Sequence, residues 1–282
     1  KTIGITTQIG LIVVISMLAT LSALTGVKRG IRILSVLNMR LTLLILVAFF
    51  VFGPTGYLIT SLANNTLDYL VNLPKLSFWV DPDTESPWQN SWTIFYWGWW
   101  IAWAPFVSMF IARISRGRTV REFVLGVLLA PTLLAIVWLT IFGNTAIYLE
   151  LFENSRITAA IDQDLTSALF ATIESMKANT TITTTIASVC VILLVTYFVT
   201  SADSATLVIC TLITMGNPDP SQQLRIFWGA AIGSVAAALL FSGGLAALQT
   251  ASILAALPFS LVVILASFSL CSSLYKEVRE SH

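Results

Sequence analysis

The sequence predicts an all-α integral membrane protein, from its composition, its long apolar segments and the charges between those segments. Only 10% of the 282 residues are charged, 56% are hydrophobic, and the mean hydropathy is +0.86. A soluble domain usually has about 25% charged residues. The chain therefore lacks the polar residues to cover its apolar ones, and lipid must be part of its solvent. The net charge of +1 gives no reason to expect a nucleic-acid partner.

Seven segments contain the run of about 20 mainly apolar residues that a helix needs to cross a bilayer. They lie at roughly 3–26, 39–63, 92–113, 120–143, 182–214, 224–248 and 250–274. Two longer connections, 64–91 and 144–181, each predict a short helix outside these spans. In the first, apolar residues have the spacing of a helix on the membrane surface: Leu67, Leu70, Val71 and Leu73. In the second, the helix is expected around Leu165, Ala168, Leu169, Ala171 and Thr172.

The loops between the spans alternate between basic and acidic, as the positive-inside rule requires. Eleven of the 15 basic residues fall on one predicted side: Lys28, Arg29, Arg32, Arg40, Arg113, Arg116, Arg118, Arg121, Arg225, Lys276 and Arg279. The other side holds most of the acidic residues: Asp68, Asp81, Asp83, Glu85, Glu150, Glu153, Asp162, Asp164 and Glu174. We therefore expect the N-terminus of this chain outside the cell and its C-terminus in the cytoplasm.

The third span carries a stripe of aromatic residues at helical spacing: Trp92, Tyr96, Trp99, Trp103, Phe106 and Phe110. A packing face or an interfacial belt explains part of it, but Trp103 is near mid-span, where an indole N–H facing lipid would be unsatisfied. Ring faces also bind a trimethylammonium group, which has no N–H to donate, by cation–π contact. Gly98 and Pro105 bracket the cluster and predict a kinked or unwound helix there. A structural aromatic core and a ligand site both remain open.

Residue types argue against an enzyme. The single histidine, His282, is the last residue, and the cysteines Cys190, Cys210 and Cys271 show no CxxC spacing. One carboxylate, Asp203, lies well inside a span; such a residue is more often functional than structural. A transporter remains the leading hypothesis, and a channel or osmosensor is the alternative.

Four stretches resemble the betaine/choline/carnitine transporter family. The longest is Trp92–Val107 with its continuation through Phe123; the others are Thr25–Asn38, Ile141–Gly143 and Phe198–Ser204. The resemblance implies the LeuT-type fold of two inverted five-helix repeats, with this chain forming helices six to twelve and five helices preceding it. Residues 1–63 would complete the first repeat, 64–91 an extracellular loop with a surface helix, 92–274 the second repeat and 275–282 the start of a cytoplasmic tail.

The resemblance also implies the site residues. Trp99, Trp100 and Trp103 would bind the substrate, and Phe106 would belong to a second sodium site. The hydroxyls of Thr200 and Ser201 and the carbonyl of Tyr197 would bind sodium, unless the hydroxyls only bond back within their helix. Neither the resemblance nor the residue types decide between sodium and a proton as the coupling ion. A part in gating is implied for a third group: Arg113, Arg116, Arg118, Arg121 and Asp203.

The resulting prediction is a secondary transporter in the bacterial cytoplasmic (inner) membrane. It would import glycine betaine, choline or a similar quaternary-ammonium solute, by sodium symport. Proton-coupled choline uptake and an osmosensor with secondary transport are the alternatives. No cofactor and no metal beyond sodium are expected; the partners would be the solute, membrane lipid and two further copies of the chain in a homotrimer.

Overall fold

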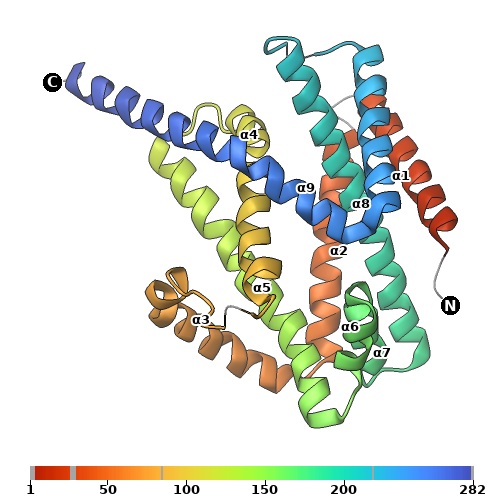
Figure 1. Cartoon of the computed structure of the whole chain (residues 1–282). Helices are drawn as coiled ribbons and strands as arrows, with labels where there is room; N and C mark the ends of the chain where they lie inside the picture. Colours follow the sequence, from red (N-terminus) through yellow and green to blue (C-terminus); the bar gives the residue numbers. More distant parts are fainter. Residues whose placement is uncertain (1–3, 26–29, 84, 218, 281–282) are drawn as a thin grey trace. The chain divides into compact units, whose positions relative to one another are not determined.

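The computed structural model describes residues 4–25, 30–83, 85–217 and 219–280, and these are helical with no strand. Figure 1 shows the helices in chain order. They are α1 (Ile5–Thr25), α2 (Gly30–Phe52), α3 (Thr55–Ser77), a π-helix (Gln89–Ile94), α4 (Phe95–Ile114), α5 (Val120–Glu153), α6 (Ile157–Gln163), a 3₁₀ turn (Leu165–Ser167), α7 (Ala168–Ser175), α8 (Thr180–Ile213) and α9 (Gln222–Glu280). The all-α prediction is confirmed for the described residues.

The helices form two compact units that are interleaved along the sequence. The first comprises Lys1–Gly26, Val80–Arg116 and Ser201–His282, and so contains α1, α4 and α9. The second comprises Val27–Trp79 and Gly117–Thr200, and so contains α2, α3, α5, α6 and α7. The division falls inside α8, between Thr200 and Ser201.

Five segments in the described chain are long and apolar enough to cross a membrane. They are Arg32–Phe52, Gln89–Ala112, Val120–Glu153, Thr180–Ile213 and Gln222–Glu280. A shorter apolar segment, Thr6–Ser22, lies in α1. The 59-residue α9 is broken at Gly243 and Gly244, and Gly244 has φ +61°, a conformation that favours glycine. The predicted sixth and seventh spans therefore lie on either side of this break, a little before the predicted boundary.

The second predicted span, 39–63, is wrong at both ends. α2 begins at Gly30 and ends at Phe52, and α3 begins at Thr55. Pro54 ends α2 because proline cannot donate a helix hydrogen bond and disfavours helix in the residue before it. Consequently Arg32 and Arg40, which were expected in a cytoplasmic loop, lie inside α2. Lys28 and Arg29 lie outside the described residues.

Both predicted short helices exist. The surface helix is α3, which is longer than expected and exposes Leu67, Leu70, Val71 and Leu73. The second is a hairpin of α6 and α7. Glu150, near the end of α5, fixes its start by accepting a hydrogen bond from the Ile157 amide at 2.8 Å. Asp164 caps the 3₁₀ turn by accepting from the Thr166 amide and hydroxyl, and these bonds lower the pKa of its carboxyl.

Each unit has its own packing. The second unit has an apolar core from α2, α5, α6, α7 and α8: Ile45, Phe49, Leu149, Ile157, Ile173, Met176, Ile186, Cys190 and Leu193. In the first unit, α1 and α9 approach closely because Gly229 and Gly233 have no side chains. A Cβ at Gly233 would lie 2.6 Å from Ser16 Oγ, and one at Gly229 would lie 2.8 Å from Thr20 Oγ1.

Candidate functional site

Gly98 sets the orientation of α4 within the first unit. It is buried against α9, where an added Cβ would lie 3.3 Å from the Cα of Ile253. Successive residues of an α-helix are about 100° apart, so Trp99, Trp100 and Trp103 lie on the sides of α4 away from this contact. They are 43%, 57% and 41% exposed in the described chain. The packing on α9 thus leaves all three indoles uncovered.

The aromatic rings of α4 form a continuous row. Phe95 and Trp99 are stacked with ring centroids 6.1 Å apart, and Trp99 and Trp100 are also 6.1 Å apart. Trp100 and Trp103 meet edge to face at 5.4 Å, with 73° between their planes. Ring faces at an angle to one another can surround one cation from more than one side, which a flat stack cannot do.

The unwound helix expected around Gly98 and Pro105 is not found. α4 is a continuous α-helix from Phe95 to Ile114, and the irregular turn is the π-helix before it, Gln89–Ile94. At Gly98 the missing side chain permits close packing on α9 rather than a backbone break. Phe106 is half-buried on the same helix, and its part in an ion site stays a prediction.

A second group of polar residues joins α2 to α8 in the second unit. Asn38 Nδ2 donates a hydrogen bond to Thr200 Oγ1 at 3.2 Å. One turn further along α2, Thr42 Oγ1 and the Tyr197 hydroxyl share a hydrogen bond of 2.7 Å. The higher-numbered residue of α2 pairs with the lower-numbered residue of α8, so the two helices run antiparallel here. About one turn beyond these two hydrogen bonds, the same faces of α2 and α8 contribute Ile45 and Leu193 to the apolar core.

The Thr200 hydroxyl also bonds within its own helix. Its Oγ1 donates to the carbonyls of Thr196 and Tyr197 at 3.1 and 3.0 Å. This is the back-bonding that the sequence left open, and it occupies the hydroxyl proton rather than the lone pairs. Ser201, the adjacent candidate, is exposed. Binding of an ion by Thr200, Ser201 and the Tyr197 carbonyl stays a prediction.

Asp203 is the most deeply buried acidic residue of the described chain, at 1% exposure. Its Oδ2 accepts a hydrogen bond from Ser22 of α1 at 2.5 Å, and its Oδ1 has no hydrogen-bond partner among the described residues. The guanidinium of Arg225, which is buried and ion-paired with Asp219, is close enough to attract the Asp203 carboxylate. Asp203 therefore links α1, α8 and α9 within the first unit.

The basic stretch after α4 is largely solvent-facing. Arg116, Arg118 and Arg121 are exposed, and the side chain of Arg113 lies outside the described part of the chain. α5 begins here with a capping box, in which Thr119 Oγ1 accepts from the Glu122 amide at 3.3 Å and Glu122 Oε2 accepts from the Thr119 amide at 2.9 Å. A part for these arginines in gating stays a prediction.

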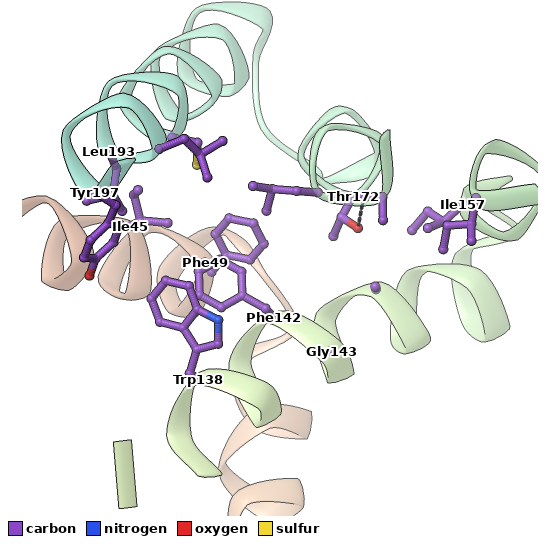
Figure 2. Close-up of a pocket in the computed structure, with 15 residues that line it drawn as sticks. Ile45, Phe49, Trp138, Phe142, Gly143, Ile157, Thr172, Leu193 and Tyr197 are labelled. Atoms are coloured by element: carbon purple, nitrogen blue, oxygen red, sulfur yellow. Dashed lines mark hydrogen bonds between the residues drawn. The ribbon is translucent and has the colours of Figure 1, made fainter. Parts of the chain in front are cut away.

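A cavity of about 420 Å³ lies in the second unit and was not predicted. Figure 2 shows its wall, to which α2 contributes Phe49, α5 contributes Trp138 and Phe142, and α8 contributes Tyr197. The Phe142 ring packs against both Phe49 and Trp138, with centroids 4.4 Å apart in each pair. The wall is almost wholly apolar and carries no charged side chain. It contains none of the three tryptophans expected to bind substrate.

Sequence reasoning also missed Asn38 and Thr42. Asn38 was placed in a loop because the predicted second span began at residue 39, and Thr42 was not singled out. Trp138 is a mid-span tryptophan, and the argument applied to Trp103 would have singled it out. The helical step from Asn38 to Thr42 to Ile45 would have shown that both polar residues share the face that becomes buried.

Comparison with known proteins defines the class. The chain matches the family described as BCCT, betaine/carnitine/choline family transporter, over residues 2–279. It is 42% identical to the glycine betaine transporter OpuD of Bacillus subtilis, over 97% of this chain and 52% of that protein. It is 40% identical to the osmo-independent choline transporter BetT1 of Acinetobacter baylyi, over 95% of this chain and 52% of that protein.

A third relative is named for a different solute. The chain is 40% identical to the ectoine/hydroxyectoine transporter of Virgibacillus pantothenticus, over 88% of this chain and 49% of that protein. The chain thus spans about half the length of the curated relatives it matches.

The apolar helices and these relatives define a multi-pass membrane protein of a transporter class, not an enzyme. The chain belongs to the betaine/carnitine/choline transporter family, as its four sequence stretches predicted.

Proposed function

We propose that the protein imports a quaternary-ammonium solute such as glycine betaine or choline by sodium symport. The observation that carries this proposal is the set of three indoles on α4 that α9 leaves uncovered, with ring planes at an angle to one another. Such faces bind a methylated cation by about 0.5–2 kcal/mol each, and more when water is excluded. The names of the relatives OpuD and BetT1 agree with that ligand class.

The same proposal covers the architecture. The chain would supply helices six to twelve of a LeuT-type fold, with α1, α2, α4, α5, α8 and the two parts of α9 as its seven spans. Residues 92–274 would form the second inverted repeat. The protein would lie in the bacterial inner membrane as a homotrimer in contact with lipid, with Asp83 outside and the C-terminus in the cytoplasm. Labelling of a cysteine at Asp83 by an impermeant reagent tests that orientation.

The coupling ion would bind beside Thr200 and Ser201. These residues are adjacent, so they project about 100° apart, and both reach one ion only if it sits in a groove beside α8. Hydroxyl and carbonyl oxygens suit a hard cation, and the unwound helices of such transporters supply further carbonyls. Proton coupling is the alternative. It is favoured where uptake does not respond to sodium at fixed pH.

The double substitution Thr200→Ala with Ser201→Ala tests the ion site. It should raise the sodium concentration for half-maximal uptake by about tenfold, if removal of the two oxygens costs about 1.4 kcal/mol of ion binding. The substrate constant at saturating sodium should change less, because the α4 indoles are untouched. The measurement is uptake of labelled glycine betaine against sodium at several substrate concentrations, in the full-length protein at matched membrane levels.

If these hydroxyls serve only their own helix, the double variant will lose stability and keep the wild-type sodium curve. That result would leave proton coupling as the better account. Ser204→Ala, on the same helix one turn from Thr200, is the matched control and should leave the sodium curve unchanged.

A further inference from the structure

The carboxylate of Asp203 is held in place by two other helices of the first unit. Asp203 lies on α8 and is 1% exposed. Its Oδ2 accepts a hydrogen bond from Ser22 of α1 at 2.5 Å, and the guanidinium of Arg225 on α9 is close enough to attract it. Because the described chain already encloses Asp203, further protein segments cannot contact its carboxylate while this packing is kept.

Two carboxylates in this region share one guanidinium. Arg225 is 6% exposed and forms an ion pair with Asp219, which precedes α9 and has a side chain that is 91% exposed. Neither α1 nor α8 contains a lysine or arginine, and Arg225 is the only basic residue of α9 before Lys276. With Asp203 and Asp219 both ionised, this group of side chains has two negative charges against one positive charge.

The excess negative charge is buried at Asp203. Its Oδ1 is buried and has no hydrogen-bond partner among the described residues, whereas Asp219 is in contact with solvent. A buried charged oxygen without a donor is destabilising and calls for a physical reason. A cation bound nearby would supply one, because charges inside a protein attract over longer distances than charges that water and salt screen.

Ser201, which the proposed function assigns to the coupling ion, is two residues from Asp203 on α8. Such residues are about 3 Å apart along a helix and about 200° apart around it, so these side chains project from opposite sides of α8, roughly 10 Å from each other. At that separation the attraction between unit charges changes the affinity for an ion on the order of tenfold, at an effective dielectric constant of about 20. Asp203 does not touch such an ion, but its charge acts on it.

The proposed ion ligands are themselves uncharged. They are hydroxyl and carbonyl oxygens, so the ion would bring a full positive charge into α8, which is long and apolar enough to span a membrane. A charge there is strongly unfavourable unless an opposite charge accompanies it. Asp203 is the only acidic residue of α8.

We propose that Asp203 is the counter-charge of the coupling ion, which it attracts through the width of α8 without binding it directly. Ser22 and Arg225 hold the carboxylate in place, and Asp219 occupies Arg225 so that the charge of Asp203 is not neutralised. This inference rests on the proposed sodium site. It adds to that site a residue that acts by charge alone.

The variant Asp203→Asn tests the proposal in the full-length protein. Asparagine has nearly the same shape and still accepts from Ser22, but it has no charge. Sodium chloride should raise the melting temperature of the purified wild-type protein above its value in potassium chloride at equal ionic strength, since a ligand that binds only the folded state stabilises it. Asp203→Asn should lose most of that sodium-specific shift. Its half-saturating sodium concentration should rise by about tenfold.

Asp219→Asn tests the sharing of Arg225 and decides the matter if Asp203→Asn does not reach the membrane. Asp219 is exposed, so the fold should tolerate its replacement. Without Asp219 the guanidinium is left to neutralise Asp203, and half-saturating sodium should rise by about threefold or more. If Asp203 only holds helices together, the loss of an exposed loop carboxylate will leave the sodium response unchanged.

Two matched controls leave these three charges in place. Ser22→Ala removes the donor to Asp203 Oδ2, and Glu174→Gln removes an exposed carboxylate of the second unit. Ser22→Ala should lower the melting temperature in both salts, because it leaves a buried oxygen without a donor. Both variants should keep the wild-type half-saturating sodium concentration.

An unchanged sodium response in either folded aspartate variant overturns the inference. An equal rise of half-saturating sodium in Ser22→Ala and Asp203→Asn also overturns it, because the carboxylate would then act only by holding α1 against α8. A sodium-specific shift in the wild type that Asp203→Asn retains leaves the sodium site standing and contradicts the counter-charge alone. Absence of any such shift in the wild type overturns the proposed sodium site and the counter-charge with it.

Discussion

Trp103 carries the most specific residue-level expectation. Its ring meets Trp100 edge to face at 5.4 Å, and the residue is 41% exposed in the described chain. Trp103→Leu should weaken glycine betaine binding by about tenfold or more, because a cation–π contact of about 1.4 kcal/mol or more is lost. Trp103→Phe should be milder, since a smaller aromatic face remains. Binding to the purified full-length protein, measured by calorimetry, reports both constants.

Trp97→Leu is the control for this prediction. Trp97 is on the same helix and is 66% exposed, and it projects about 120° away from Trp103 around the helix axis. Its loss should leave betaine binding unchanged. Equal effects of leucine and phenylalanine at Trp103, with both variants folded, would rule out an aromatic cage.

The sequence identified the aromatic residues but not their polar counterparts. Tryptophans in an apolar span stand out because an indole N–H needs a partner. Asn38 and Thr42 matter only because α2 turns them towards Tyr197 and Thr200, and that depends on where α2 begins. A helix start shifted by several residues removed Asn38 from the predicted span and hid the pattern.

At the scale of elements, the ends of the helices were predicted less accurately than their centres. Hydropathy is averaged over a window, so it locates the centre of a span better than its ends. The Gly53–Pro54 pair is the local signal for the end of α2, and a hydropathy window that continues into the apolar residues beyond it does not detect it. The length of α8 and the existence of α7 were predicted correctly, whereas α3 is longer than the short surface helix that was predicted.

The contact of α1 with α9 offers a direct test of packing. Gly233→Ala places a Cβ 2.6 Å from Ser16 Oγ and 2.8 Å from Ser16 Cβ, so one helix must shift. We expect a loss of stability of about 1–3 kcal/mol, seen as a lower melting temperature in detergent. Combination with Ser16→Gly should restore much of it, because the colliding atoms are gone.

Gly126→Ala is the matched control for that packing test. Gly126 is on α5 with nothing within 4 Å of an added Cβ. Alanine there should be neutral or stabilise the helix by up to about 1 kcal/mol. A Gly233→Ala protein as stable as the wild type would show that α1 and α9 do not depend on this close approach.

At the scale of the whole molecule, the two compact units alternate along the sequence and divide the predicted site residues between them. One unit carries the α4 indoles, and the other carries Asn38, Thr200 and the apolar cavity. α8 belongs to both, because the division between the units falls at the Thr200–Ser201 peptide. The predicted ion ligands thus lie at the one point in α8 where the chain passes from one unit to the other. Composition and periodicity could not reveal this, because they carry no information about which distant segments pack together.

Uptake by the full-length protein in sealed vesicles tests the central claim most directly. With an inward sodium gradient at fixed pH, labelled glycine betaine should accumulate above its external concentration, and Trp103→Leu should abolish that accumulation at low substrate. Potassium in place of sodium should leave only equilibration. Accumulation that needs a proton gradient and ignores sodium would contradict the coupling. No accumulation of any quaternary-ammonium solute by a folded, membrane-inserted protein would contradict the account as a whole.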